Sequence, residues 1–426
     1  MGAWASVDPG SSVPAVATKE KRVKLVAIGD VGVVDGMIHI GDEAMFERFV
    51  DRMLARGARG IVGLSSAPAE TAARYGIDAI GQVRFAGDAT RIEHEERLER
   101  VIRTAAGEGG LLDPDDSAHA VIDAVREADG VAITGGGNLA SIWPTNIFGR
   151  AAIGGIARAL DTPLVISGQT LGPELSVVDR DLVGSLLRAA ALVGVREPAS
   201  FELASTLGLT DTLHLTADDA SFLGELDVPT GAYCAVTLST HLGGVDRGAF
   251  FDACAALLDA VAASTGLEIV FLAHYGALDP SDRRGDTVMH DAVAERMSGA
   301  SRHEQITDSA AAATFARGAA LHVTSRYHPA VFAVAAGVPT IGMPVDDYTT
   351  VKLTGALAGF GQHGVVPVAD VMDGSATERV LAVWRERADI RSRGLHIAAT
   401  RRAESEGWWD RIASVFGGGD TRNDRA

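Results

Sequence analysis

The sequence predicts an α/β protein with two doubly wound, Rossmann-like domains that face a cleft. The first observation is an alternation, along most of the chain, of short apolar runs and longer helical patterns, with glycine-rich or polar turns between them. This order favours parallel strands covered by helices on both faces of a sheet. The second is the length of 426 residues, which is too great for one ordinary core. The third is an interruption by proline and glycine at residues 224–231 (GELDVPTG), after which the alternation begins again.

The first domain is predicted to occupy residues 21–224. Each expected strand is a short aliphatic run, and each expected helix follows a polar or glycine-rich turn. The helix at residues 90–104 carries opposite charges at salt-bridge spacing, so it presents a solvated face. The strands are expected at residues 23–28, 60–64, 131–134, 164–167, 192–195 and 213–216. The other helices are expected at residues 43–56, 118–127, 147–160, 179–190 and 199–207.

The second domain is predicted to occupy residues 231–400 by the same alternation. Residues 401–426 are expected to form a C-terminal helix and a flexible tail, and residues 1–20, which are small and polar, a disordered N-terminal arm. The strands of the second domain are expected at residues 233–238, 268–272, 321–324 and 340–342. The helices after residue 231 are expected at residues 247–263, 286–297, 309–317, 330–336, 376–387 and 403–416.

The composition excludes several classes of protein. A net charge of −18 argues against nucleic acid or an anionic membrane surface as a partner. No apolar run has the length expected of a bilayer span, and the N-terminus lacks the apolar core of a secretory signal. Cys234 and Cys254 have neither metal-ligand nor disulfide spacing, so they fit packing residues in a reduced compartment. We therefore expect a cytoplasmic protein without an integral membrane segment, which reaches the inner face of the membrane, if at all, through its substrate.

Residues 321–352 are the most informative part of the chain. A buried strand is expected to end at Ser325-Arg326-Tyr327-His328 and to be followed by an apolar helix. The N-terminus of a helix favours an anion, arginine adds a planar fork for carboxylate or phosphate, and histidine can move a proton near neutral pH. Lys352 is the one lysine after Lys24. Its compact ammonium group suggests a specific use, although a surface position is the alternative. The segment predicts an enzyme that acts on an anionic small molecule.

Polar and glycine-rich turns follow several strands of the first domain, where ligands of doubly wound sheets bind. The turns of Gly136-Gly137-Asn138 and Gln169 are candidates for substrate binding, although a triple glycine also serves tight turns. Asp42 and Glu43 begin a helix and are either functional or capping residues. Arg196 either binds an anion in the cleft or pairs with Glu197 or another local acid.

Other patterns leave their alternatives open or are absent. His241 and His274 follow predicted strands and are either cleft histidines or ordinary hydrogen-bonded ones. The sequence contains neither a GxGxxG nor a GxxxxGK[ST] phosphate loop at these turns, and no metal-ligand spacing. We therefore expect no metal site and no cofactor.

The motifs GDEAMF, GGGN, GQTLGP, VREPASFELASTLGL, ADDASF, SRYHPAVFAVAAGVPTIGMP and VDDYTTVKLTGAL, in this order, resemble the polysaccharide pyruvyl transferase family. The resemblance implies a GT-B-like fold and transfer of pyruvate from phosphoenolpyruvate onto a sugar as a ketal. Arg326 and His328 match the catalytic Arg-x-His motif of the family, Arg196 its other cleft arginine, and Lys352 its downstream lysine. His39 stands where the family often has asparagine, and residues 67–116 match nothing diagnostic.

The resemblance therefore implies that phosphoenolpyruvate binds the second domain and that a sugar or lipid-linked glycan acceptor binds the first. Ketal formation requires protonation of C3 of the enol ether, attack of a sugar hydroxyl at C2, and displacement of phosphate by a second hydroxyl. His328 would transfer a proton, unless it is a structural histidine between helix and strand. A nucleotide-sugar glycosyltransferase and a non-catalytic glycan-binding protein are the alternatives, and a homo-oligomer is compatible with the sequence.

Overall fold

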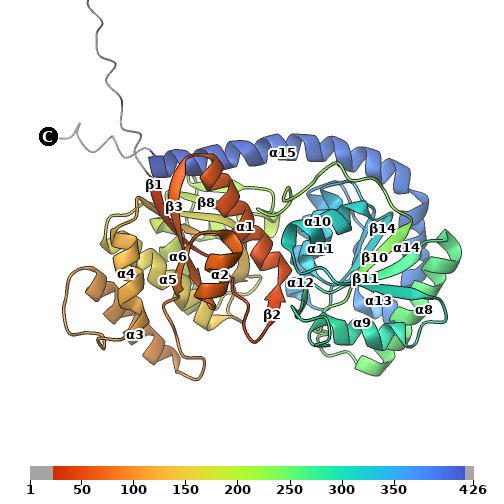
Figure 1. The fold of residues 1–426 in the computed structure, drawn as a ribbon, viewed down its shortest axis with the longest axis horizontal. Helices are drawn as coiled ribbons and strands as arrows, with labels where there is room; N and C mark the ends of the chain where they lie inside the picture. The colour runs from red at the N-terminus through yellow and green to blue at the C-terminus, as the bar shows by residue number, and fades with distance from the viewer. Residues whose placement is uncertain (1–22, 418–426) are drawn as a thin grey trace, which may run out of the picture.

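The computed structural model describes residues 23–417 and consists of two α/β domains, each built on a parallel sheet (Figure 1). The predicted fold class is confirmed. Residues 1–20, for which a disordered arm was predicted, and residues 418–426 of the predicted tail lie outside the described part of the chain.

The sheet of the first domain has the strand order β4-β3-β1-β5-β7-β8-β9, with β6 paired to β7. All these pairs are parallel because a crossover connects consecutive strands. The strands are β1 (Val23–Ile28), β3 (Ala58–Ser65), β4 (Asp78–Gly81), β5 (Gly130–Ile133), β6 (Gly136–Leu139), β7 (Leu164–Leu171), β8 (Leu192–Val195) and β9 (Leu213–Leu215). The helices are α1 (Ile40–Ala55), α2 (Pro68–Tyr75), α3 (Arg91–Ala105), α4 (Ser117–Arg126), α5 (Pro144–Ala159), α6 (Val177–Ala189) and α7 (Pro198–Thr206).

The sheet of the second domain has the order β13-β11-β10-β14-β15 and is also parallel. Both cysteines are free and buried in its core, as predicted. The strands are β10 (Tyr233–Thr237), β11 (Glu268–Leu272), β13 (Ser301–Glu304), β14 (Leu321–Thr324) and β15 (Thr340–Gly342). The helices are α8 (Arg247–Thr265), α9 (Asp286–Ala294), α10 (Ser309–Gly318), α11 (Tyr327–Val334), α12 (Asp347–Ala358), α13 (Val368–Met372), α14 (Ala376–Arg385) and α15 (Arg387–Gly417).

Helix α8 is, among the described residues, the one helix long and apolar enough to cross a membrane by length and composition alone. The sequence predicted no membrane-spanning segment. Phe250, Leu258 and Val261 of this helix are buried in the core of the second domain. Its apolar character is therefore accounted for by packing against the sheet.

Two elements join the domains. Strand β2 (Met37–His39) leaves the first domain and pairs antiparallel with β12 (Tyr275–Ala277) of the second. Helix α15 runs along the whole molecule and ends over the first domain (Figure 1), where Trp408 and Trp409 are buried beside α1 and β1. The cleft therefore lies between domains that are connected on more than one side.

Candidate functional site

A cavity of about 800 Å³ lies where the domains meet, at the carboxyl ends of strands of both sheets. This is the edge at which doubly wound sheets bind ligands. Residues of the first domain form one wall and residues of the second domain the other. Of the site residues predicted from the sequence, the cavity is lined by Asp42, Gly137, Asn138, Ser325, Arg326, His328 and Lys352.

Arg326 is the N-cap residue of α11, directly after β14, where the sequence placed it. Its Nε and Nη2 donate to the carboxylate of Asp286 at 3.1 Å and 2.5 Å. Asp286 is fully buried, which would raise its pKa, but the Arg326 guanidinium holds that pKa below its usual value. The same carboxylate accepts the backbone N–H groups of His274 and Tyr275. This network fixes the guanidinium at the wall of the cavity.

His328 lies in the first turn of α11 and is 9% exposed. Its Nε2 has no hydrogen-bond partner among the described residues and lies 3.7 Å from the carboxylate of Asp218. Burial, assisted by the charges of Arg196 and Lys352, lowers the pKa of His328 well below 6.5. The imidazole is therefore neutral at pH 7 and able to accept a proton.

Gly41 explains how the imidazole fits against the first domain. A Cβ at this position would lie 1.9 Å from Nδ1 of His328, so only glycine permits the close approach. This is the physical requirement behind the glycine of the GDEAMF motif.

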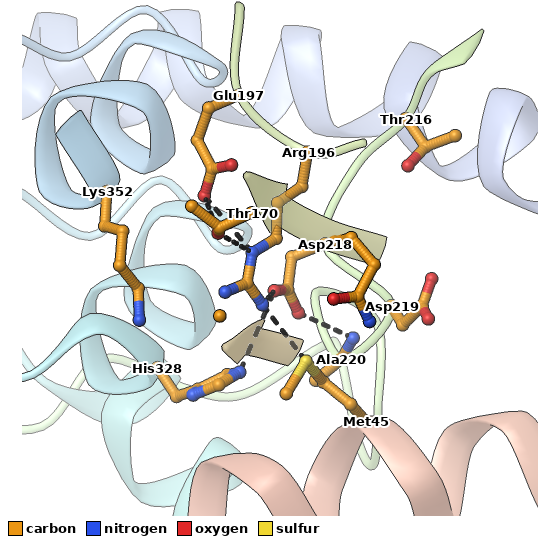
Figure 2. Close-up of polar contacts among 12 residues, drawn as sticks. Met45, Thr170, Arg196, Glu197, Thr216, Asp218, Asp219, Ala220, His328 and Lys352 are labelled. Carbon is orange, nitrogen blue, oxygen red and sulfur yellow. Dashed lines mark hydrogen bonds and ion pairs between the residues drawn. The ribbon is translucent and has the colours of Figure 1, made fainter. Parts of the chain in front are cut away.

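Arg196 is held behind the cavity wall by polar contacts on several sides (Figure 2). Nε donates to Thr170 Oγ1 at 2.8 Å and to Glu197 at 3.1 Å, while Nη1 donates to Asp218 at 2.7 Å. Its side chain is 1% exposed, and its guanidinium lies 4.4 Å from the centre of the Tyr327 ring. The sequence left two roles open for Arg196, anion binding in the cleft or pairing with a local acid. The structure shows the pairing, with both Glu197 and Asp218. The arginine does not itself line the main cavity.

Lys352 is positioned by two tyrosines. Its Nζ lies 4.9 Å and 4.7 Å from the ring centres of Tyr327 and Tyr348, and 3.2 Å from the Tyr348 hydroxyl. None of the described carboxylates forms an ion pair with it. A Cβ at Gly137 would lie 2.6 Å from Tyr348 Oη, 2.9 Å from Lys352 Nζ and 3.3 Å from Arg196 Nη2. The Tyr348 hydroxyl donates to Gly137 O at 2.5 Å, so Lys352 Nζ and Arg196 Nη2 are the cationic donors that converge where the glycine leaves space.

The wall of the first domain is acidic. Asp30 accepts from Asn138, and from Arg150 at 2.6 Å, while Asp42 lies in the first turn of α1. Burial in the cleft, together with the charge of Asp30, raises the pKa of Asp42 to about 7. Ser325 faces this wall from the second domain, and its Oγ accepts the N–H of Ser239 at 2.8 Å. The wall of the second domain carries Arg326 and Lys352, and its one lining carboxylate among the described residues, Asp346, is bonded by His241 and Thr349. The unpaired positive charge of Lys352 therefore faces the carboxylates of the first domain.

The structure does not bring Glu43, Gln169 or Gly136 to the cavity. Glu43 is 1% exposed, accepts the Gly32 N–H at 2.8 Å and bonds the Tyr75 hydroxyl. Gln169 is buried and donates to Thr134 O at 2.5 Å. Their expected part in substrate binding stays a prediction that these contacts do not favour.

Several lining residues were left out of the sequence-based site. His39 and Trp143 line the cavity, as do both histidines left open, His241 and His274. Neither ring nitrogen of His274 has a hydrogen-bond partner among the described residues, and burial lowers its pKa well below 6.5. The position of His274 shortly after the strand β11 was the sequence signal that could have assigned it to the cavity. No sequence signal of this kind marks Trp143.

Among residues 23–417, no group of three or more His, Cys, Asp or Glu residues could hold a metal ion.

Comparison with known proteins agrees with this geometry. A family model described as polysaccharide pyruvyl transferase matches residues 39–347, which is most of the chain. A search of curated proteins found no match.

Solved structures share the fold at low sequence identity. CalG4, the calicheamicin glycosyltransferase, is 16% identical with a TM-score of 0.53, and the match covers 94% of this chain and 100% of CalG4. A putative UDP-N-acetylglucosamine 2-epimerase from Listeria monocytogenes is 15% identical with a TM-score of 0.57, covering 94% of this chain and 98% of the epimerase. The glycosyltransferase VinC, in complex with DTDP, is 13% identical with a TM-score of 0.53, covering 93% of this chain and 100% of VinC. The architecture is therefore that of GT-B glycosyltransferases.

Proposed function

The chain belongs to the polysaccharide pyruvyl transferase family, and from that premise we propose that it transfers the enolpyruvyl group of phosphoenolpyruvate onto a sugar of a cell-surface polysaccharide or its precursor. The product is a pyruvate ketal, and phosphate is released. The observation that carries this proposal is the division of charge across one cavity. Arg326 and Lys352 lie on the wall of the second domain, where the carboxylate of Asp346 is paired with His241. Asp30 and Asp42 lie on the wall of the first domain.

The cationic wall suits the donor. Phosphoenolpyruvate carries a carboxylate and a phosphate, and two separated cations can bind one each. Lys352 is the stronger attraction for an anion because no described carboxylate neutralises it directly. Arg326 shares its charge with Asp286 and orients the ligand through the fixed plane of its guanidinium.

The acidic wall suits the acceptor. Carboxylates accept hydrogen bonds from sugar hydroxyls, and ketal formation removes a proton from each of two hydroxyls. Asp30 and Asp42 are in position to accept such bonds from a sugar between the walls.

The chemistry needs a base and an acid, and two titratable groups of the cavity hold matching protonation states near pH 7: His328 is neutral, and Asp42 retains its proton in part of the molecules. His328, neutral at pH 7, accepts the proton of the attacking hydroxyl as its oxygen bonds to C2. Asp42, whose pKa is raised to about 7, carries the proton that C3 gains. The second hydroxyl then displaces phosphate, which leaves with the remaining proton. The scheme uses phosphoenolpyruvate as a substrate and no cofactor.

Calorimetric titration with phosphoenolpyruvate, in parallel with UDP- and GDP-sugars, tests the proposal. The informative variant is Lys352→Ala, because removing this ammonium leaves no buried carboxylate without its ion pair. Arg326→Ala would instead leave the fully buried Asp286 unpaired. We expect saturable binding of phosphoenolpyruvate that Lys352→Ala weakens at least tenfold. Binding of a nucleotide sugar without any response to phosphoenolpyruvate would favour a glycosyltransferase instead. We further propose a cytoplasmic location, because phosphoenolpyruvate is a metabolite of that compartment.

A further inference from the structure

A second cavity, of about 720 Å³, lies beside the cleft in the first domain, at the carboxyl ends of β3 and β4. Asn146 lines both cavities, and Arg150 of the second donates to Asp30 of the first. We propose that this second cavity binds an anionic group, phosphate or carboxylate, carried by the acceptor next to the sugar that is modified. The inference rests on the proposed function, because it extends the acceptor side of that site.

Arginine supplies the charge of this cavity, which is lined by Arg84, Arg97 and Arg150. Arg97 is neutralised by two hydrogen bonds to Asp116. The Arg84 side chain is exposed, and its guanidinium pairs with none of the described residues. In a chain with a net charge of −18, an unpaired arginine beside a large cavity is a specific attraction for an anion.

Arg150 adds a buried positive charge to the wall of this cavity. Its side chain is 5% exposed, yet its Nε has no hydrogen-bond partner among the described residues. This nitrogen has almost no accessible surface, so Arg150 acts on a ligand through its charge rather than through this atom. Because Arg150 lines the second cavity while its Nη2 donates to Asp30, its positive charge lies between the two cavities.

The N-terminus of α5 also favours an anion in the second cavity. This helix begins at Pro144, has no acidic residue in its first turn and has no side-chain cap at Trp143. Pro144 has no N–H and the Asn146 N–H bonds Trp143 O at 3.1 Å, so the Thr145 N–H is the one of this turn left for an external acceptor. Thr145 and Asn146 both line the second cavity. We assign this cavity to the acceptor rather than to the donor, because every residue that lines it belongs to the first domain, which is the acceptor side of the proposed site.

An apolar part of the main cavity wall precedes Asn146, the residue that lines both cavities. Trp143 and Ile142 line the main cavity although they are 47% and 56% exposed. An exposed tryptophan on the wall of a sugar site packs against the apolar face of a sugar ring. An acceptor that lies on Trp143 in the cleft would extend past Asn146 into the second cavity.

Calorimetric titrations with α-D-glucose 1-phosphate, D-glucuronate and methyl α-D-glucoside test this assignment. They are performed on the Lys352→Ala variant, in which anion binding to the donor wall is weakened, and on Lys352→Ala with Arg84→Gln. We expect one or both charged sugars to bind and the neutral glucoside not to bind. Arg84→Gln should weaken that binding about tenfold, the value of one charge-assisted hydrogen bond. Arg100→Gln, which removes an exposed arginine of α3 outside this cavity, is the matched control.

The outcomes separate the two proposals. Preference for glucose 1-phosphate assigns a phosphate site, and preference for glucuronate a carboxylate site. Equal binding of the neutral sugar, or binding unaffected by Arg84→Gln, would overturn the inference. Phosphoenolpyruvate is titrated into wild-type protein and into Arg84→Gln alone, where its affinity should be the same. If phosphoenolpyruvate fails to bind the wild type while the charged sugars bind as expected, the donor assignment fails and the second anion site stands.

Discussion

Gly41 is the residue on which the position of His328 depends. We predict that Gly41→Ala lowers kcat at least tenfold and leaves the affinity for phosphoenolpyruvate nearly unchanged, because Lys352 and Arg326 do not contact this position. The displaced imidazole should also cost about 1–3 kcal/mol of stability. Steady-state kinetics and urea unfolding measure both effects.

The control for that change is Gly407→Ala. Gly407 lies inside α15, and nothing lies within 4 Å of a Cβ built there. Alanine at such a helical position should stabilise the protein by up to about 1 kcal/mol. Equal activity of the two variants would show that the contact between Gly41 and His328 does not matter to catalysis.

The raised pKa of Asp42 leads to a second prediction, which concerns the pH dependence of the reaction rate. A carboxyl with a pKa near 7 is protonated below that value, so the form that can donate a proton is lost as the pH rises. We expect kcat/KM to fall above about pH 7, and Asp42→Asn to lower activity about 10²–10⁴-fold and to remove this limb of the profile. A pH–rate profile that keeps the same limb in Asp42→Asn would assign the acid to another group.

Helix α15 carries the main prediction at the scale of elements. Trp409 is completely buried, and its ring centre lies 6.4 Å from that of Phe49 on α1. Arg56 and Arg52 of α1 pair with Glu406 one turn earlier. We predict that Trp409→Ala costs about 3–5 kcal/mol of unfolding free energy, whereas the part-exposed Trp384→Ala costs less. Denaturant unfolding measures this difference, and equal costs would mean that α15 contributes little to the first domain.

The limits of sequence reasoning follow from the geometry of these elements. Asp42 and Glu43 are neighbours on a helix, so their side chains point about 100° apart, and only Asp42 lines the cleft. Gly136 and Gly137 are neighbours on a strand and face opposite sides, so only Gly137 lines it. The sequence located the turns correctly, but it did not establish which residue of each turn points inward.

Long-range pairings were also beyond the sequence. Strands β2 and β12 have three residues each and pair across the two domains, with the His39 and Tyr275 rings stacked at 4.1 Å. Segments this short carry no periodicity. Asp286, which fixes Arg326, looked like an ordinary helix start. The alternation of strands and helices, by contrast, was sufficient for the fold class, and the strand-end rule was sufficient to place Arg326 and His328 at the cleft. Lys352, which lies inside α12, was selected as the lone lysine after Lys24 and by the family resemblance.

At the scale of the whole molecule, the half-buried and buried carboxyls of the first domain respond to pH in the opposite direction to the buried histidines of the second. Burial raises the pKa of Asp42, Glu47 and Asp219 to about 7 in the first domain. Burial lowers the pKa of His290 to about 4 and of His322 to about 3 in the second. A carboxyl with a raised pKa binds its proton more tightly in the folded state, so the first domain gains stability as the pH falls from about 7 toward 4.

Protonation of the buried histidines changes the stability of the folded state in the opposite direction. They bind protons more readily in the unfolded state, so their contribution to stability is lost as the pH falls below 6.5 toward their folded values. We therefore predict that a change from about pH 7.5 to 5.5 increases the protection of β1 and β5 amides and decreases that of β10 and β14. Hydrogen exchange, corrected for the intrinsic dependence of the exchange rate on pH, measures both. Asp219→Asn should reduce the gain in the first domain, and a change of equal sign in both domains would contradict the assignment.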